Sequence, residues 1–310
     1  MQETRAAVLE AMADGPVSGP TVAERLGVSR AAVWKHVQAL REAGFTIDSG
    51  DDGYELAGVP EFGGPAVEYG LDAPFELEFH DSIDSTNALA RDLAAEGRSD
   101  VVVLADEQTG GRGRLDRAWT SPSGGVWLSI LFRPTVPPAT VPLFTLAAAV
   151  ATARAARAAG VDATIKWPND VLVDGDKLAG ILTEMEGEAD RVSWVVVGVG
   201  VNGNVDPAAL PREDATSLRS ELGGPVDRRG FTQRLLESFD TLRTDRDAIL
   251  PAWRDLSATL GREVRVETPG GTVRGTAVDV RHPGALLVET DDGTEVVTAG
   301  DCGHVRSDDT

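Results

Sequence analysis

Three uncharged runs rich in β-branched residues restrict the fold of this chain more than any other feature of its sequence. They span residues 101–105 (VVVLA), 126–132 (VWLSILF) and 194–199 (WVVVGV). A continuous apolar run of this length is typical of a strand that is buried on both faces of a sheet. Residues 85–95 and 143–159 have helical patterns, but helices and strands do not alternate regularly as in a doubly wound sheet. The pattern therefore predicts a central domain of mixed α/β type.

Shorter elements flank this central part on both sides. Residues 1–56 contain three helical segments and then two short apolar stretches around Asp51-Asp52-Gly53, which is a hairpin signal. Ser29 is placed to cap the third helix, residues 30–42, so a winged helix-turn-helix is predicted here. Near the C-terminus, short strands separated by turns predict a small β-barrel. We therefore expect an α+β protein with domains at residues 1–60, 66–258 and 262–307, and a Gly- and Pro-rich linker at residues 57–65.

The basic residues have an unusual composition. Only three of the 29 are lysines, Lys35, Lys166 and Lys177, and the net charge is −21. The acidity is spread along the whole length. Together with the loss of lysine this is typical of a protein from an extreme halophile, and an ordinary acidic protein is the alternative. Unless the three lysines cluster by chance, they are expected where a compact ammonium does what a guanidinium cannot.

The cysteine content and the apolar runs indicate where the protein works. Cys302 is the only cysteine, so the chain has neither an internal disulfide nor a thiolate metal cluster. This fits a reducing cytoplasm. The N-terminal residues lack the regions of a signal peptide, and the longest uncharged run, residues 134–153, contains four prolines. We therefore expect a cytoplasmic protein with no membrane partner.

A glycine- and arginine-rich loop follows the first buried strand. In Gly110-Gly111-Arg112-Gly113-Arg114 the glycines let the backbone approach a ligand, and the arginines can bind phosphate or carboxylate oxygens. An anion-binding loop is favoured over a mobile polar loop, and the P-loop pattern is absent. Residues 198–203 match a dinucleotide fingerprint by letter, but no helix follows them. They are predicted to be a strand that enters a tight turn, where Asn202 can hydrogen-bond a ligand.

A second polar segment combines a cation, an amide and a carboxylate in Lys166-Trp167-Pro168-Asn169-Asp170. Asp170 could hold Mg²⁺, which prefers carboxylate and phosphate oxygens. In the alternative, the segment is a structural turn closed by a Lys166–Asp170 pair. Lys177 leads into the apolar residues 178–182, so its ammonium is expected to have a partner. With the two arginines of the loop, the two lysines supply four cations against one carboxylate, which suits a carboxylate that attacks a phosphate.

Taken in order, these segments carry a resemblance to a known family. Their order and spacing are similar to those of the biotin–protein ligases. The segments that carry this resemblance are Asp84-Ser85-Thr86-Asn87, Gln108, Gly111-Arg112-Gly113-Arg114, Trp119, Lys166-Trp167-Pro168-Asn169-Asp170, Lys177-Leu178-Ala179-Gly180 and Gly198-Val199-Gly200-Val201-Asn202. The flanking domains resemble the bifunctional branch, which also represses biotin synthesis genes. The resemblance implies a class II synthetase-like catalytic domain and a C-terminal SH3-like β-barrel.

The resemblance also implies an ATP-dependent reaction in two steps. Biotin and MgATP form biotinyl-5′-adenylate, and biotin is then transferred to a lysine of the biotin carboxyl carrier domain of a biotin-dependent carboxylase. The implied catalytic residues are Arg112, Arg114 and Lys177. The implied biotin-binding residues are Ser85, Thr86, Asn87, Gln108, Gly111, Arg112, Gly113, Arg114 and Lys177. The implied adenylate-binding residues are Arg114, Trp119, Asn169 and Asn202, and the implied Mg²⁺ ligand is Asp170.

Operator DNA and a second copy of the chain are the other implied partners. In the family, repression depends on a homodimer of the adenylate-bound form. Ser29, Arg30, Lys35 and His36 would face the DNA from the third helix. Residues 1–56 carry five Lys and Arg against nine Asp and Glu, so their attraction to phosphate is weak in ordinary salt. In the alternative, this domain only packs on the catalytic domain.

The loop departs from the family pattern after Arg114. The family continues with another glycine and often a further basic residue, whereas Leu115-Asp116-Arg117 follows here. This is expected to stiffen the loop and to weaken retention of the adenylate, with activity preserved. Two other functions stay open, a lipoate–protein ligase and a biotin-sensing transcription factor without ligase activity. The Gly/Arg loop together with Lys-Trp-Pro-Asn-Asp disfavours the first, and the intact set of catalytic cations disfavours the second.

Overall fold

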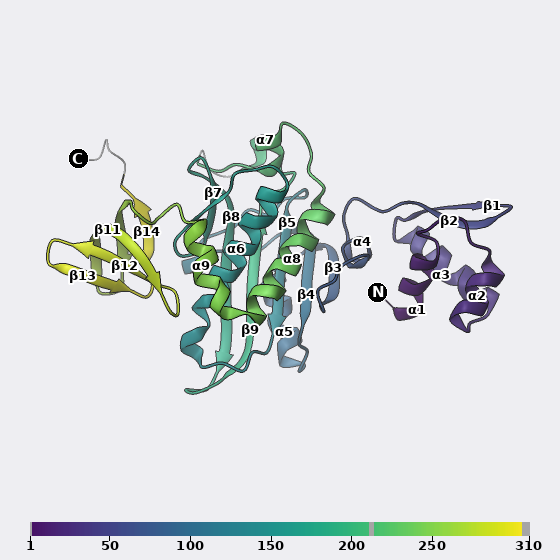
Figure 1. The fold of residues 1–310 in the computed structure, drawn as a ribbon, viewed down its shortest axis with the longest axis horizontal. Coiled ribbons are helices and arrows are strands. Elements are labelled where there is room, and N and C mark those ends of the chain that lie inside the picture. Colours follow the sequence, from purple (N-terminus) through teal and green to yellow (C-terminus); the bar gives the residue numbers. More distant parts are fainter. Residues whose placement is uncertain (1, 211–213, 306–310) are drawn as a thin grey trace. The chain divides into compact units, whose positions relative to one another are not determined.

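The structure is a computed structural model that describes residues 2–210 and 214–305 (Figure 1). The chain divides into two compact units between Leu71 and Asp72. The first unit contains the N-terminal helices and their hairpin. The second contains a large mixed sheet, its helices and the C-terminal strands.

The first unit is a winged helix-turn-helix, as predicted. Its elements are α1 (Glu3–Ala11), α2 (Gly19–Leu26), α3 (Arg30–Glu42), β1 (Thr46–Gly50), β2 (Gly53–Gly58) and the short α4 (Gly64–Glu68). The three longer helices share one core, which includes Val8, Leu9, Met12, Val33, Val37 and Leu40. Ser29 caps α3, and its hydroxyl oxygen accepts a hydrogen bond from the amide of Ala32 at 3.1 Å. The predicted linker is partly structured, because β2 runs to Gly58 and α4 begins at Gly64.

A seven-stranded sheet forms the centre of the second unit, in the order β3-β4-β5-β9-β8-β7-β6. The strands are β3 (Glu76–Ile83), β4 (Val101–Gln108), β5 (Val126–Phe132), β6 (Thr164–Lys166), β7 (Asp170–Val173), β8 (Asp176–Gly187) and β9 (Val192–Val201). β3 and β4 are parallel, and the other neighbours are antiparallel. The three uncharged runs become β4, β5 and β9, which lie next to one another. The prediction of a mixed α/β domain is confirmed.

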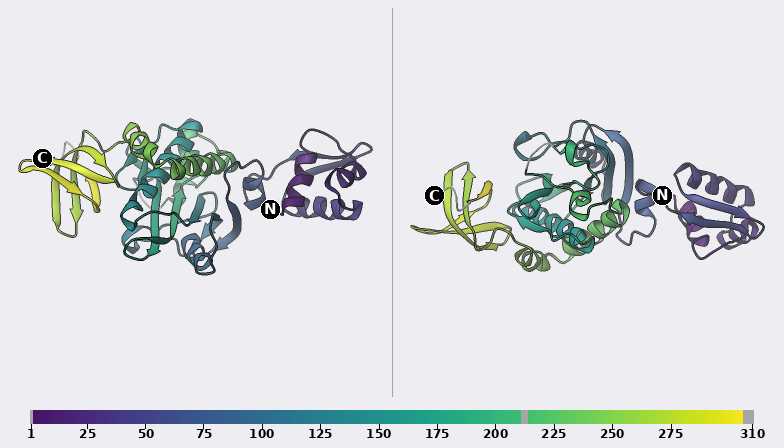
Figure 2. Two further views of the ribbon diagram at one scale, coloured as in Figure 1. Left: turned by 60° about the horizontal axis from the view of Figure 1, so that its bottom comes forward. Right: turned by 90° about the horizontal axis from the view of Figure 1, so that it is seen from above.

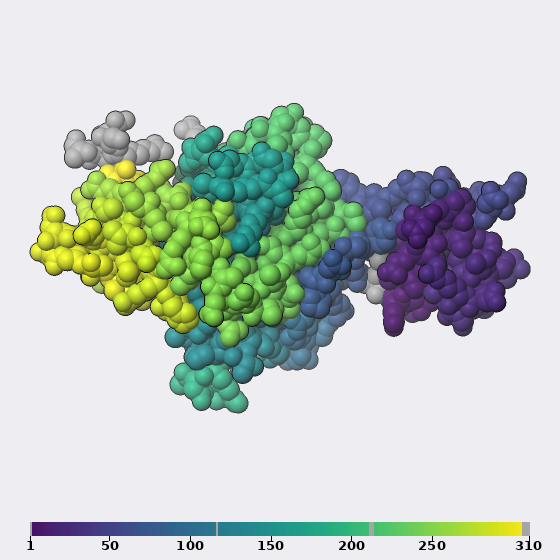
Figure 3. Space-filling view, viewed as in Figure 1, coloured from purple at the N-terminus to yellow at the C-terminus, as the bar shows by residue number. Residues whose placement is uncertain are grey.

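Helices cover both faces of this sheet. Consecutive residues of a strand point to opposite sides, so a strand that is apolar throughout needs a packing partner on each face. Leu131 of β5 packs in a cluster with α5 (Thr86–Ala95). The next residue, Phe132, contacts Phe144 of α6 (Pro142–Ala158) and Phe239 of α8 (Arg228–Thr244) edge-on. α6 and α8 lie side by side in Figures 1 and 2 and stand in front of the sheet in Figure 1, and Figure 3 shows the surface of the protein in the same view. The helices are α5 (Thr86–Ala95), α6 (Pro142–Ala158), α7 (Leu218–Leu222), α8 (Arg228–Thr244) and α9 (Ile249–Asp255), with 3-10 turns η1 (Arg114–Asp116), η2 (Pro138–Thr140), η3 (Pro207–Ala209) and η4 (Arg246–Ala248).

The apolar segment that includes α6 is part of this core. Residues Pro138–Ala158 are long and apolar enough to cross a membrane by length and composition. However, 72% of their most apolar 18-residue stretch is buried inside the protein. Such burial is typical of a core helix in a globular domain.

The C-terminal strands form a five-stranded antiparallel sheet in the order β13-β12-β11-β10-β14. They are β10 (Glu263–Thr268), β11 (Gly271–Arg281), β12 (Ala285–Thr290), β13 (Gly293–Val297) and β14 (Asp301–His304). The sequence predicted the first four strands and missed β14, which is only four residues long. Trp167 ties this sheet to the central one, since its indole Nε1 donates a hydrogen bond to the carbonyl oxygen of Gly284 at 2.9 Å.

Candidate active site

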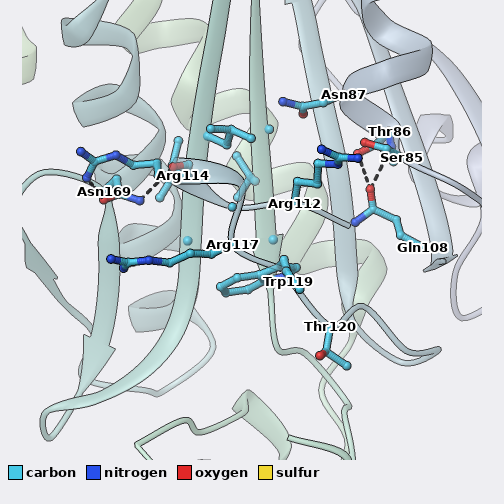
Figure 4. A pocket seen from close by; sticks show the side chains of 18 of the residues that line it. Ser85, Thr86, Asn87, Gln108, Arg112, Arg114, Arg117, Trp119, Thr120 and Asn169 are labelled. Atoms are coloured by element: carbon cyan, nitrogen blue, oxygen red, sulfur yellow. Dashed lines mark hydrogen bonds between the residues drawn. The ribbon is translucent and has the colours of Figure 1, made fainter. Parts of the chain in front are cut away.

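A cavity of about 590 Å³ opens beside the central strands (Figure 4). Its wall comes from the start of α5, the Gly/Arg loop after β4, the turn before β7, and strands β8 and β9. It brings together most of the residues singled out in the sequence: Ser85, Thr86, Asn87, Gln108, Arg112, Gly113, Arg114, Trp119, Asn169, Asp170, Lys177 and Asn202. Gly111 does not line the cavity. It packs against the loop's own backbone, where a Cβ atom would come within 2.4 Å of the carbonyl oxygen of Trp119.

Gln108 organises one end of the cavity. Its Oε1 accepts hydrogen bonds from the amide of Thr86 at 2.8 Å and from the hydroxyl of Thr86 at 3.0 Å. Its Nε2 donates to the hydroxyl oxygen of Ser121 at 2.9 Å. Ser85 is the N-cap of α5, with its hydroxyl oxygen 3.4 Å from the amide nitrogen of Ala88. The start of α5 and the end of β4 are thus held together by side chains that line the cavity.

Asn87 is fixed by residues that the sequence did not reveal. Its Nδ2 donates to Glu184 Oε2 at 2.7 Å, and its Oδ1 lies 2.5 Å from the hydroxyl of Ser129. Arg91 pairs with the other oxygen of Glu184 at 2.5 Å. Gly198 lies below, where a Cβ atom would come within 2.2 Å of Asn87 Oδ1. Glu184 and Ser129 stand within strand patterns, and only their spatial neighbours give them a role.

The indole of Trp119 lies on a floor of two glycines. Gly180 of β8 and Gly200 of β9 are paired across the sheet. A Cβ atom on Gly200 would come within 2.7 Å of the indole Nε1, and one on Gly180 within 3.1 Å of the ring. The ammonium of Lys177 lies 5.1 Å from the centroid of the same ring, within the range of a cation–π interaction. The family resemblance implied that Trp119 binds the adenylate, and its fit to this floor makes it part of the cavity wall.

Lys177 has the partner expected for it, which is Asp170. Lys177 Nζ lies 2.6 Å from Asp170 Oδ1, and both side chains are mostly shielded from solvent. The alternative was a turn closed by a pair between Lys166 and Asp170, and only its backbone part agrees with the structure. The backbones of these two residues are in register in the β6–β7 hairpin, but the carboxylate of Asp170 pairs with Lys177.

The Gly/Arg loop is attached to the C-terminal sheet. Arg114 donates one hydrogen bond to Asn169 Oδ1 and another to the carbonyl oxygen of Gly300, both at 2.9 Å. Asn169 uses its Nδ2 to donate to the carbonyl oxygen of Ile181 at 3.0 Å. Figure 4 shows Arg114 and Arg117 on one side of the cavity and Arg112 on the side of Thr86 and Gln108. The two predicted loop arginines therefore reach opposite ends of the site.

Arg117 strengthens the attachment of the loop. It forms an ion pair with Asp301 at 2.6 Å. The hydrogen bond from Arg117 keeps the pKa of Asp301 below its usual value, against the effect of burial. Leu115, at the tip of the loop, has a left-handed backbone (φ 56°) and a side chain that is 74% exposed. Among the residues that depart from the family pattern, Arg117 thus joins the loop to the C-terminal sheet.

Asn202, which was predicted to hydrogen-bond a ligand at the turn after β9, makes its contacts with the protein itself. Its Nδ2 donates to the carbonyl oxygen of Thr216 at 2.9 Å, and the side chain is 5% exposed. In turn, the amide of Thr216 donates to the carbonyl oxygen of Lys177 at 3.0 Å. Asn202 therefore positions the backbone beside Lys177.

Among the residues that the structure describes, four acidic side chains line the cavity, those of Asp84, Asp170, Glu184 and Asp301. Within residues 2–210 and 214–305 there is no group of three or more His, Cys, Asp or Glu side chains that could enclose a metal ion. Asp170 is the acidic side chain beside Lys177. A single carboxylate suits Mg²⁺ that is held mainly by substrate phosphates, and not a metal held by the protein alone.

The predicted DNA-facing residues lie on α3 in the first unit. Ser29, Arg30 and Lys35 are exposed, and His36 is half-buried. Arg41, on the same helix, is occupied by the wing, because its guanidinium donates to the carbonyl oxygen of Ile47 at 2.7 Å and to the hydroxyl of Ser49 at 2.7 Å. Arg41 thus joins α3 to the wing.

Comparison with known families finds three matches along the chain. Residues 79–202 match the model of the biotin/lipoate A/B protein ligase family, and residues 259–305 match the biotin protein ligase C-terminal domain. Residues 5–55 match a helix-turn-helix (HTH) domain.

Individual relatives agree with these matches. The chain is 37% identical over 301 residues to a bifunctional ligase/repressor of Bacillus subtilis, covering 92% of this chain and 93% of that protein. It is 34% identical over 233 residues to a biotin–[acetyl-CoA-carboxylase] ligase of Paracoccus denitrificans, covering 70% of this chain and 96% of that protein. Among solved structures it is similar to the biotin protein ligase of Aquifex aeolicus in complex with biotin and ATP, with a TM-score of 0.63 and 26% identity over 74% of this chain and 99% of that one.

Proposed function

Because this chain belongs to the biotin protein ligases, in the branch that joins a ligase to a repressor, we propose that its cavity is the site at which biotin and ATP are condensed. The product is biotinyl-5′-adenylate. The biotinyl group then passes to a lysine of a biotin carboxyl carrier domain in a biotin-dependent carboxylase. The observation that carries this proposal is the convergence of Lys177, Arg112 and Arg114 on one cavity.

The first step brings two negative groups together. An oxygen of the biotin carboxylate attacks the α-phosphorus of ATP, the bond from that phosphorus to the bridging oxygen breaks, and pyrophosphate leaves. Cations at the reacting oxygens offset both the repulsion of the substrates and the charge that develops during the attack. Lys177 is proposed to lie between the carboxylate and the α-phosphate, where it exchanges its contact with Asp170 for contacts with the substrates.

The polar groups around Gln108 and α5 are proposed to bind the ring system of biotin. Ser85, Thr86 and Gln108 present hydroxyl and amide groups that match a ureido ring, with Arg112 on the same side of the cavity. Arg114 and Asn169 are hydrogen-bonded to each other at the other end, which suits the adenylate. Trp119 offers a flat apolar surface between these ends, and Asn202 holds the backbone beside Lys177.

Asp170 is the residue proposed to hold Mg²⁺ at the phosphates. A bound Mg²⁺ would neutralise phosphate charge and help pyrophosphate to leave. In Asp170→Asn we therefore expect pyrophosphate release to require more Mg²⁺, while equilibrium binding of biotin without nucleotide is little changed. An unaltered Mg²⁺ dependence would remove Asp170 from this role.

The Gly/Arg loop is proposed to protect the intermediate. An acyl-adenylate is a mixed anhydride that water hydrolyses, so exclusion of water is essential until the acceptor arrives. The unprotonated amine of the carrier lysine then attacks the acyl carbon, an amide forms, and AMP leaves. No enzyme nucleophile is needed. Cys302 is buried, and desolvation raises the pKa of its thiol to about 11, so it stays inert in a reducing cytoplasm.

The first unit is proposed to bind operator DNA through α3 when the adenylate is bound, as a homodimer. Two features support this role, the match of residues 5–55 to an HTH domain and the exposed Arg30 and Lys35. Sedimentation with and without biotin and MgATP tests the homodimer, and a monomer under both conditions would contradict it.

One experiment tests the ligase. The protein is mixed in concentrated KCl with labelled biotin, MgATP and a carrier domain, and the carrier is analysed for label. We expect labelled carrier, with no label in the absence of ATP. A parallel reaction with lipoate separates the related activity. Label from lipoate but not from biotin would overturn the proposal, and label from neither would indicate a biotin sensor without ligase activity.

A further inference from the structure

An exposed tryptophan lies in the middle of the proposed DNA-facing surface. Trp34 of α3 is 55% exposed, and no hydrogen bond or ring contact involves it in the part of the chain that the structure describes. Val33, Val37 and Leu40 of the same helix are fully buried in the core. The register of the helix therefore holds Trp34 outward, and rotation of α3 to bury it would expose these residues.

The neighbours of Trp34 define the surface on which it lies. Arg30 is four residues before it, and Ala31 and Lys35 are likewise four residues apart, so all four share one side of the first two turns. α2 ends at Leu26, and the next residue, Gly27, has a left-handed backbone (φ 66°) that turns the chain so that Ser29 can cap α3. This helix-turn-helix geometry places α3 in the position of a recognition helix, whose N-terminal residues reach base edges.

The net negative charge of the first unit limits the DNA affinity that phosphate contacts can supply, so an apolar contact would contribute a larger share. Residues 1–56 carry five basic against nine acidic side chains, and Arg41 is already bound to the wing. Affinity that comes from phosphate contacts falls steeply as salt rises, because counterions are released on binding. Contact between apolar groups does not depend on this release, and it persists in concentrated salt.

We propose that Trp34 reads the operator by packing against thymine C5-methyl groups in the major groove, so that recognition is largely apolar and tolerates salt. This inference rests on the proposed repressor function, and it adds the residue and the type of contact. DNA is favoured over a second copy of the chain as occupant, because the surface combines cations with the position of a recognition helix. A protein interface would use the same tryptophan without any dependence on thymine.

The test begins with selection of DNA from a random-sequence pool by the full-length protein, with biotin and MgATP in concentrated KCl. Affinity for the recovered sequence is then measured for the wild type, Trp34→Ala, Trp34→Phe and Lys35→Ala over a range of salt. We expect Trp34→Ala to lose at least about tenfold in affinity, as buried aromatic anchors do, with an unchanged salt slope. Trp34→Phe should keep part of the affinity, and Lys35→Ala should lower the salt slope by about one phosphate contact.

Replacement of thymine by uracil in the recovered sequence identifies the contact. Each lost methyl should weaken the wild type about fourfold and leave Trp34→Ala unaffected, since the partner of the methyl is already gone. Met185→Ala, which changes another exposed apolar side chain, should bind as the wild type does. Carrier biotinylation should be unchanged in every variant, because the ligase site lies in the second unit, and a circular dichroism spectrum and unfolding curve like those of the wild type show that the first unit folds.

Each other result has a distinct meaning. If the wild type enriches no sequence, the repressor function fails and the inference fails with it. If a sequence is enriched but Trp34→Ala binds it equally well, only the inference is overturned. If Trp34→Ala loses affinity only because it no longer dimerises, as sedimentation would reveal, Trp34 belongs to a protein interface and the inference is again overturned.

Discussion

Lys177 Nζ and Asp170 Oδ1 lie 2.6 Å apart on adjacent strands at the wall of the active-site cavity. The pair keeps an ammonium available inside a largely apolar sheet, where an unpaired charge would be costly. It also keeps the ammonium close to the place where the substrates must meet. Substrate oxygens can replace the carboxylate as partners without a large movement of the lysine.

Lys177→Arg should therefore reduce formation of the adenylate strongly. A planar guanidinium on a longer side chain cannot occupy the position of a compact ammonium between two oxygens, and loss of one such contact costs about 100-fold or more in rate. Pyrophosphate release measures the effect, with thermal unfolding to confirm that the fold is intact. Lys166→Arg is the matched control and should react nearly as the wild type does. Unchanged pyrophosphate release in Lys177→Arg would refute the role given to Lys177.

Glu184→Ala should weaken biotin binding through Asn87. The substitution removes the partner of Asn87 Nδ2 and leaves Arg91 unpaired at the rim of the cavity. Loss of a bond to a charged group costs about 1.5–3 kcal/mol, so KM for biotin should rise at least about tenfold with a smaller change in kcat. Glu184→Gln should restore part of the affinity. Glu188→Ala, which breaks an exposed pair with Arg191, should leave KM unchanged; equal KM values for both alanine variants would contradict this role.

Asp301→Asn should shorten the lifetime of the bound adenylate. It weakens the ion pair with Arg117 and loosens the loop from the C-terminal sheet. Release of preformed biotinyl-adenylate, chased with unlabelled biotin and ATP, measures the lifetime. In the wild type the ion pair is fully formed above the ordinary pKa of an aspartate and is lost only as pH falls through the lowered pKa of Asp301. Release that is equally slow in Asp301→Asn would exclude Arg117 and Asp301 from adenylate retention.

His304 should make the second unit sensitive to mild acid. Its imidazole is buried beside Thr259, and desolvation, with Lys166 and Arg262 nearby, lowers its pKa to about 4. The unfolded chain therefore binds the proton first, near its ordinary pKa of 6.5, so stability should fall as pH drops from about 6.5 to about 4. Denaturant unfolding at several pH values measures this slope. A slope of the same size in His304→Gln would show that other groups cause it.

The fold could be predicted where local pattern and packing agree. The uncharged runs became β4, β5 and β9, since such runs are stable only when both faces are covered. Ser29 and the hairpin around residues 51–53 followed from capping and turn chemistry. β14 was missed because four residues with one buried cysteine have no strand pattern of their own, and β10 supplies the edge on which they pair.

The site was predictable as a set of segments, but not as a set of contacts. From the sequence we predicted that Lys177, Asp170 and the Gly/Arg loop belong to one site. Whether Asp170 binds Mg²⁺ or pairs with Lys166 stayed open. The roles of Glu184, Ser129 and Gly300 depend on residues 97, 42 and 186 positions away. Such contacts come from the strand order and not from spacing along the chain.

The distribution of lysines also decides how this enzyme is protected from its own product. An acyl-adenylate that escapes into solution acylates unprotonated amines, and guanidinium groups do not react because they stay protonated. Lys166 and Lys177 are half-buried, so among the described residues Lys35 is the one exposed lysine side chain. A surface that carries arginine in place of lysine thus offers few lysine amines for self-biotinylation. Released adenylate should therefore acylate lysines of other proteins more readily than those of this enzyme.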